Sequence, residues 1–283
     1  MNPWRRKKQL EAFFTEDIGE QDYSTDLLFP KDHHGRLTFT SKAEGIFCGA
    51  EIITDGYQLL DPSITVKHYI HDGEWMHAGD TIATIDGPVR ELLKGERVTL
   101  NLIQRMSGIA TMTKKAIEAL NDENIRICDT RKTTPGLRSF EKYAVRTGGG
   151  YNHRFGLYDA VMLKDNHISF FGSVREAITR AKAAVGHTVK IEVETETESQ
   201  VVEAVEAGAD IIMFDNRTPD EIKHLATLVP SSITTEASGG ITLETLPDYR
   251  GLEIDYISLG LLTHSAKALD ISARVATTKE EVR

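Results

Sequence analysis

The chain has 283 residues, of which 40% are hydrophobic and 27% charged, and its formal net charge is −10 at pH 7. These proportions exclude wholesale disorder and allow one large domain or two smaller ones. The acidic balance argues against a general nucleic-acid or membrane-surface binder, because either function needs an extended basic face.

The features that bear on the compartment indicate the cytoplasm. Cys48 and Cys128 are the only cysteines; they are too few for a disulfide framework, so we expect two reduced, buried thiols. Acidic residues interrupt the basic N-terminal segment before any hydrophobic region forms, which is unlike a signal peptide. No stretch approaches the roughly 20 apolar residues that a membrane span needs. We therefore expect a soluble cytoplasmic protein.

The first part of the chain, residues 1–110, predicts an α/β domain. A helix-like start at 8–14 precedes short alternating segments such as "RLTFTSKAEGIFCG", at 36–49, which are typical of a mostly antiparallel sheet. Apolar residues then recur at helical spacing over 96–120 and predict a long amphipathic helix. Arg105 lies off the apolar stripe of this helix, so we expect it to be solvated.

After residue 120 the pattern alternates between strands and helices. Six apolar segments predict strands that end near positions 129, 164, 194, 215, 236 and 259. Their near-continuous apolar character is typical of a parallel sheet that is buried on both faces. A complete (β/α) barrel has eight strands, so the six strands predict an incomplete barrel over residues 111–270. A doubly wound open sheet is the alternative fold.

Polar side chains follow nearly every predicted strand, at the sheet edge where parallel α/β folds bind their ligands. The cations among them are Arg131, Lys132, His153, Arg154 and Lys164. Arginine binds carboxylates in bidentate fashion and lysine supplies a compact charge, so these cations together fit a ligand with more than one carboxylate. Ion pairs with acids at neighbouring strand ends are the alternative for any single one of them.

The acids at the strand ends fit a different ligand. Glu192 and Glu194 lie two apart on one strand and therefore point to the same face, and Asp215 ends the next strand. Separate carboxylates of this kind suit a hydrated Mg²⁺ that is shared with substrate phosphates. Each of them could instead pair with Lys164 or Arg131, and the choice between the two glutamates stays open.

A glycine-rich turn predicts a phosphate site late in the barrel. Ser238, Gly239 and Gly240 follow the fifth predicted strand, and Gly260 follows the sixth. Such turns present free N–H groups, and barrels often bind phosphate after their last two strands. As an alternative chemistry, Lys164 at a strand end could form a Schiff base, as in aldolases.

Three further cations between positions 129 and 154 need a separate interpretation. Arg138, Lys142 and Arg146 recur every four residues on a predicted helix that also carries Glu141. We expect these side chains to form a solvated or interface face rather than part of the ligand site.

The string "DTRKTTPGLRSFEKYAVRTGGGYNHRFGLYDAVMLKDNHI" resembles the quinolinate phosphoribosyltransferase family, as do "GERVTLNLIQRMSGIAT", "IMFDN" and "TEASGGI". The resemblance implies an N-terminal α/β open-faced sandwich domain, to which a segment from about 271 to 283 returns, and an incomplete α/β barrel. The implied reaction joins quinolinate to phosphoribosyl pyrophosphate (PRPP) and yields nicotinate mononucleotide, pyrophosphate and CO₂. It requires Mg²⁺ and is a step of NAD biosynthesis.

The resemblance also implies roles for single residues in a homodimer or larger homo-oligomer. The quinolinate dicarboxylate would be held by the cations Arg131, Lys132, His153, Arg154 and Lys164, by the adjoining Thr130, and by Arg97 of the neighbouring subunit. Catalytic roles fall on Lys132, Lys164, Glu194 and Asp215, of which the two acids would serve Mg²⁺ and the ribose. The phosphate would be bound by Ser238, Gly239, Gly240, Gly260 and His264.

Two other functions remain as alternatives. A related phosphoribosyltransferase that takes a monocarboxylate such as nicotinate should need fewer cations in the base pocket. A non-catalytic ligand sensor should lack Glu194 or Asp215, and both are present. The intact set of cations therefore favours quinolinate.

Overall fold

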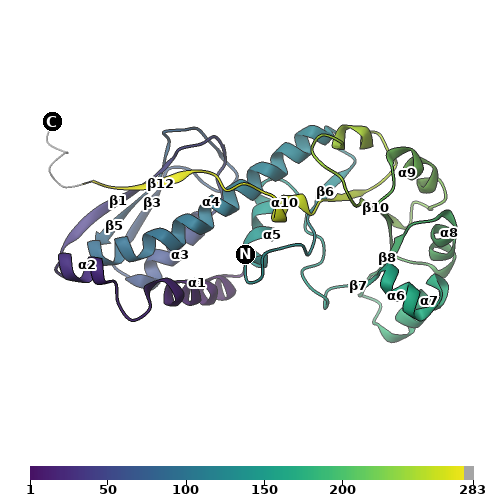
Figure 1. Ribbon diagram of the computed structural model, residues 1–283, viewed down its shortest axis with the longest axis horizontal. Helices are drawn as coiled ribbons and strands as arrows, with labels where there is room; N and C mark the ends of the chain where they lie inside the picture. The colour runs from purple at the N-terminus through teal and green to yellow at the C-terminus, as the bar shows by residue number, and fades with distance from the viewer. Residues whose placement is uncertain (277–283) are drawn as a thin grey trace. The chain divides into compact units, whose positions relative to one another are not determined.

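The computed structural model describes residues 1–276, which divide into two compact units (Figure 1). Unit 1 contains residues 1–112 and 139–148 and the segment that begins at residue 266, and unit 2 contains residues 113–138 and 149–265. Helix α4 (Val89–Leu120) contributes residues to both units. No helix within residues 1–276 combines the length and the apolar character that crossing a membrane requires.

Unit 1 contains a four-stranded sheet in the order β12-β1-β5-β3, in which every neighbouring pair is antiparallel. Strand β12 pairs with β1, and Val275 lies opposite Leu37. Besides α4, the elements of unit 1 are α1 (Pro3–Ile18), α2 (Tyr23–Leu28), β1 (His34–Ser41), β2 (Gly45–Ile46), α3 (Ala50–Leu60), β3 (Thr65–His68), β4 (Trp75–Met76), β5 (Thr81–Pro88), β12 (Ile271–Ala276) and all of α5 (Arg138–Thr147) except its first residue. The antiparallel sheet expected in the first part of the chain is confirmed.

Alternating burial along β1 builds the core of unit 1. Leu37, Phe39 and Ser41 are fully buried, whereas Thr38 and Thr40 between them are partly covered. The ring centroid of Phe39 lies 6.3 Å from that of Tyr57 on α3. Burial of a large apolar side chain contributes about 2 kcal/mol, so hydrophobic contact holds α3 against this face of the sheet.

Helix α5 differs in part from the expected solvated or interface face. Lys142 and Glu141 are fully buried, Arg138 is half-buried, and Arg146 is exposed. Nε of Arg105 donates a hydrogen bond of 2.8 Å to Oε1 of Glu141, so the expectation that Arg105 is merely solvated is wrong as well. Helical spacing shows which residues share a face, but it does not show whether another part of the fold covers that face.

Unit 2 is built around a parallel sheet of six strands in the order β6-β11-β10-β9-β8-β7. These strands are β6 (Arg126–Cys128), β7 (Val161–Leu163), β8 (Ile191–Thr195), β9 (Ile211–Asp215), β10 (Thr234–Ser238) and β11 (Tyr256–Ser258). From β7 to β11 each strand lies beside the next one in sequence, and β6 follows β11. A doubly wound sheet would reverse this direction at a switch point. Within residues 1–276, β6 and β7 do not pair, so the strand order is that of an incomplete barrel.

The sheet of unit 2 has two chemically different faces. Side chains such as Val193, Phe214 and Ala237 are fully buried on one face. On the other face, the strand register aligns Glu194 with Met213, which in turn aligns with Glu236. Because successive side chains of a strand alternate between faces, strands that look almost wholly apolar can still present a polar interior.

Helices follow the strands of unit 2 and lie outside the sheet (Figure 1). They are α6 (Asp165–Phe171), α7 (Val174–Ala184), α8 (Glu198–Ala207), α9 (Pro219–Ala226), the 3-10 helix η1 (Leu246–Tyr249) and α10 (Leu261–His264). Thr197 with Gln200 begins α8, and Thr218 with Glu221 begins α9, each pair as a reciprocal capping box. These caps fix the turns that directly follow the polar ends of β8 and β9.

Candidate active site

One buried acid, Asp129, links the end of β6 to the segment that follows Gly148–Gly150. The carboxylate of Asp129 is fully buried and accepts hydrogen bonds from the backbone N–H of His153 at 2.9 Å and from Nδ2 of Asn152 at 2.6 Å. Oγ1 of Thr130 accepts the backbone N–H of Lys132 at 3.0 Å, which shapes the turn after the strand. The sequence "TRK" and the sequence "NHR" are therefore brought to the same strand end.

The guanidinium of Arg154 is anchored on one side, and its buried Nε lacks a partner among the described residues. Its Nη1 donates to the carbonyl of Ala160 at 2.9 Å. Its Nε is buried and has no hydrogen-bond partner among the described residues. Burial lowers the pKa of Arg154, and repulsion from the nearby Arg131 lowers it further. A carboxylate ligand would relieve both effects, because it supplies an acceptor and a negative charge.

Lys164 and Glu194 form an ion pair between the end of β7 and β8. Partial burial raises the pKa of Glu194, the pairing with Lys164 acts in the opposite direction, and the charges of Asp215 and Asp165 raise it again. Pairing between cations and acids at neighbouring strand ends, which was the alternative to ligand binding, thus occurs here. Lys164 remains partly exposed, so the pair lies at an accessible surface.

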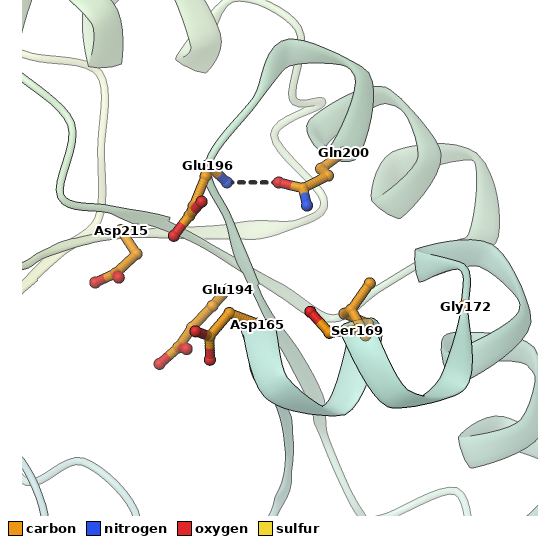
Figure 2. Close-up of a pocket in the computed structure, with 8 residues that line it drawn as sticks. Asp165, Ser169, Gly172, Glu194, Glu196, Gln200 and Asp215 are labelled. Carbon is orange, nitrogen blue, oxygen red and sulfur yellow. Dashed lines mark hydrogen bonds between the residues drawn. The ribbon is translucent and has the colours of Figure 1, made fainter.

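A cavity of about 260 Å³ adjoins this ion pair (Figure 2). Four carboxylates line it, from Asp165, Glu194, Glu196 and Asp215. The backbone N–H of Glu196 donates to Oε1 of Gln200 at 2.7 Å, which fixes the turn at the edge of the cavity. Carboxylate oxygens beside open space are the donors that Mg²⁺ prefers, since this ion retains several waters. The residues present therefore fit a magnesium ion.

The glycine-rich turn after β10 is shaped by close contact with the end of β9. Gly239 has a φ of +95°, and a Cβ placed on it would lie 2.2 Å from Oδ1 of Asn216. The backbone N–H of Asn216 donates to the carbonyl of Ser238 at 2.8 Å. Only glycine fits this position, because a side chain would clash and the left-handed backbone disfavours other residues. The next residue, Gly240, is exposed with a φ of +65°.

Gly260 begins α10 and brings two predicted site residues together. A Cβ placed on Gly260 would lie 2.9 Å from Cδ of Lys132 and 3.1 Å from the His264 ring. Oγ1 of Thr263 donates to the backbone carbonyl of Lys132 at 2.7 Å, so the turn after β6 is anchored to α10. Lys132 and His264 are both exposed.

Glu236, a buried acid close to His153, was not among the predicted site residues. Nε2 of His153 lies 3.1 Å from Oε2 of Glu192 and 3.6 Å from Oε1 of Glu236. The side chains of both glutamates are at most 5% exposed. Burial, followed by the charge of Glu192, raises the pKa of Glu236 to about 7. The signal was present, because Glu236 lies two residues before Ser238 and therefore on the same face of β10.

The other predicted residues divide between the units. Arg97 is exposed on α4 in unit 1. All the remaining predicted site residues belong to unit 2.

Both parts of the chain match known families. Residues 22–107 match the family model "Quinolinate phosphoribosyl transferase, N-terminal domain", and residues 109–274 match the model of the C-terminal domain. The chain belongs to the quinolinate phosphoribosyltransferase family. The expected family and the expected fold, an incomplete α/β barrel with an N-terminal α/β domain, are therefore confirmed.

Members of the quinolinate phosphoribosyltransferase family resemble the chain over nearly its full length. A protein of Bacillus subtilis named probable nicotinate-nucleotide pyrophosphorylase (carboxylating) is 56% identical over 282 residues, which cover 100% of this chain and 97% of that protein. The crystal structure of NadC from Streptococcus pyogenes is 44% identical, with a TM-score of 0.94 and 98% coverage of both chains. The nicotinate-nucleotide pyrophosphorylase of Francisella tularensis is 32% identical, with a TM-score of 0.90 and 98% coverage of both chains.

Proposed function

We propose that this chain transfers the phosphoribosyl group of PRPP to quinolinate and releases pyrophosphate and CO₂, which makes it a pentosyltransferase of NAD biosynthesis. The observation that carries the proposal is the group of cations at the strand ends of unit 2 in a member of this family. Among the described residues the buried Nε of Arg154 has no partner, so Arg154 and the nearby Arg131 can donate hydrogen bonds to a dicarboxylate.

The base site is the part of the proposal that distinguishes quinolinate from nicotinate. Arg131, Lys132, Arg154 and Lys164 supply more positive charge than one carboxylate needs. Lys132 and Lys164 are partly or fully exposed, so they can reach a ligand without unfolding of the site. The cations fix both carboxylates and neutralise them, and none of them has to transfer a proton.

The PRPP site follows from the other strand ends. The turn of Ser238, Gly239 and Gly240, together with Gly260 and His264, presents backbone N–H groups and an imidazole to the 5′-phosphate. Glu194 and Asp215, at the acidic cavity, would hold Mg²⁺ and the ribose hydroxyls. When it is bound, Mg²⁺ neutralises charge on the pyrophosphate leaving group.

The chemistry then requires mainly positioning from the protein. The pyridine nitrogen attacks the anomeric carbon of the ribose while the bond to pyrophosphate breaks. The ring nitrogen becomes cationic, so it stabilises the carbanion that forms when the adjacent carboxylate leaves as CO₂. A proton taken up at that ring carbon completes nicotinate mononucleotide. Pocket cations and ring charge thus account for the reaction without a general base at the strand ends.

Assembly and location are further parts of the proposal. We infer a homodimer or larger homo-oligomer in which Arg97 completes the base site of a neighbouring subunit, because Arg97 is exposed on α4 and belongs to unit 1. We also infer a cytoplasmic location, which is consistent with Cys48 and Cys128 being free and buried thiols.

A reconstitution assay tests the proposed function. Pyrophosphate release should require quinolinate, PRPP and Mg²⁺ together, and omission of any one should abolish it. Equal turnover with nicotinate would overturn the substrate assignment in favour of a monocarboxylate enzyme. Borohydride inactivation that depends on a carbonyl substrate and is lost in Lys164→Arg would instead support a Schiff-base lyase.

A further inference from the structure

Both ring nitrogens of His153 are engaged within the protein. Nδ1 lies 2.8 Å from the backbone nitrogen of Arg154, and that N–H can only donate. Nδ1 must therefore be an acceptor, which leaves the ring neutral with its proton on Nε2. Nε2 faces Glu192, whose two oxygens lie 3.1 and 3.2 Å away.

The surroundings of the ring favour this state. The side chain of Glu192 is 1% exposed and that of His153 is 11% exposed, so water competes little for their hydrogen bond. Oε1 of Glu236 lies 3.6 Å from Nε2, and this side chain is also buried.

Arg154, whose backbone N–H donates to the His153 ring, also belongs to the proposed base site. The backbone of Arg154 is held by Nδ1 of His153, and its guanidinium is held by the carbonyl of Ala160 at 2.9 Å. Among the described residues, nothing accepts from its buried Nε. The two anchors fix the direction of this donor before a ligand arrives, which lowers the ordering cost of binding.

We propose that Glu192 and His153 are positioning residues for Arg154: Glu192 holds the His153 ring with its proton on Nε2, and Nδ1 of that ring holds the backbone of Arg154 in place for a ligand carboxylate. The inference rests on the proposed quinolinate site, and it assigns to His153 an internal role in place of a direct ionic contact with the substrate.

The state of the ring can be measured without any substrate. In ligand-free protein labelled with ¹⁵N-histidine, long-range ¹⁵N–¹H spectra identify which ring nitrogen carries the proton, and the His153→Asn variant assigns the signals. The proposal predicts a neutral His153 with the proton on Nε2 at neutral pH. A doubly protonated ring, or a proton on Nδ1, would overturn it, whatever reaction the enzyme catalyses.

Kinetics then separate positioning from a merely structural role. Glu192→Leu removes the acceptor at nearly constant volume, and we expect the KM for quinolinate to rise about ten-fold, with kcat and the KM for PRPP changed less than about two-fold. Glu192→Gln retains an acceptor oxygen and should recover most of the loss. The exposed Glu253→Gln is the matched control and should behave as the wild type.

Three results would contradict the proposal: an unchanged KM for quinolinate in Glu192→Leu, equal damage to the KM values of both substrates, or equal damage in Glu192→Gln. If Glu192→Leu does not fold, Glu192→Gln and the wild-type spectra still decide the question. Absence of quinolinate turnover in the wild type would refute the proposed function, whereas the spectra would still report the state of His153.

Discussion

The side chain of Lys132 passes directly over the α-carbon of Gly260. A Cβ at Gly260 would lie 2.9 Å from Cδ of Lys132, which is closer than two carbon atoms normally approach. Gly260 has an ordinary helical φ of −64°, so its backbone does not require glycine. Glycine is required at position 260 because the Lys132 side chain lies against it. A substitution at Gly260 should therefore affect function through Lys132 and leave folding intact.

Gly260→Ala should therefore reduce activity without unfolding the protein. The added methyl group would displace the ammonium group of Lys132 and crowd His264, and we expect kcat/KM to fall at least about ten-fold because small misplacements at an active site are costly. The thermal midpoint should change little. Gly186→Ala is the matched control, since no atom lies within 4 Å of its new Cβ. Full activity in Gly260→Ala would show that the position of Lys132 does not matter.

The acidic cavity predicts a dependence on magnesium. Asp215→Asn keeps the size of the side chain but removes its charge, so we expect the Mg²⁺ concentration needed for half-maximal activity to rise about ten-fold. A chelator should stop the wild-type reaction, and added Mg²⁺ should restore it. Asp248→Asn, at an exposed position, is the control. An unchanged requirement for Mg²⁺ in Asp215→Asn would contradict the assignment of this carboxylate.

The raised pKa of Glu236 predicts that the stability of the folded protein depends on pH. Its pKa in the folded protein is raised to about 7 by burial and by Glu192, with smaller contributions from His153 and Ser258, which lower it, and from Glu194, which raises it. A group whose pKa is higher in the folded than in the unfolded protein contributes its full stabilisation of the fold below the unfolded pKa. That contribution is lost as the pH rises through the folded pKa. Glu236→Gln does not titrate, so it avoids this loss.

Differential scanning fluorimetry checks this effect. The thermal midpoint of Glu236→Gln relative to the wild type should be higher by a few degrees at about pH 8 than at about pH 5. The exposed Glu253→Gln should show a constant difference across the same range. A difference for Glu236→Gln that is the same at both pH values would mean that Glu236 ionises normally in the folded protein.

Arg97 predicts complementation between subunits. Arg97→Ala and Lys132→Ala should each be nearly inactive, because each removes a cation from every base site. If Arg97 serves a neighbouring subunit, a mixed dimer contains one site with neither substitution, so mixing should restore about a quarter of the wild-type activity by random pairing. Native mass spectrometry verifies the exchange of subunits. No recovery despite confirmed exchange would contradict a shared site.

The sequence predicted the strands of unit 2 well because each strand end carries a distinct polar signature after an apolar run. It also placed Glu194, Asp215 and Ser238 at one sheet edge, since parallel strands bring their carboxyl ends together. It did not predict the burial of Lys142 and Glu141, which depends on distant segments that cover helix α5. A charged residue at regular spacing gives no information about such contacts.

Contacts inside unit 2 show a second limit of prediction from the sequence. The sequence predicts that Glu192 shares a face with Glu194. Its contact with His153 also needs the segment between α5 and β7 to return to the end of β6, where Asp129 holds it. Glu236 was not among the predicted site residues, although it lies on β10 two residues before Ser238. Contacts between residues 39 or more positions apart, as from His153 to Glu192, are set by topology, and the local pattern does not encode them.

The central claim is that one active site couples phosphoribosyl transfer to decarboxylation of quinolinate. The most direct measurement follows both products at once, with quinolinate that carries an isotopic label in the carboxylate next to the ring nitrogen. We predict one labelled CO₂ for each pyrophosphate, and neither product without PRPP. Pyrophosphate release without labelled CO₂, or equal pyrophosphate release with nicotinate, would contradict the account.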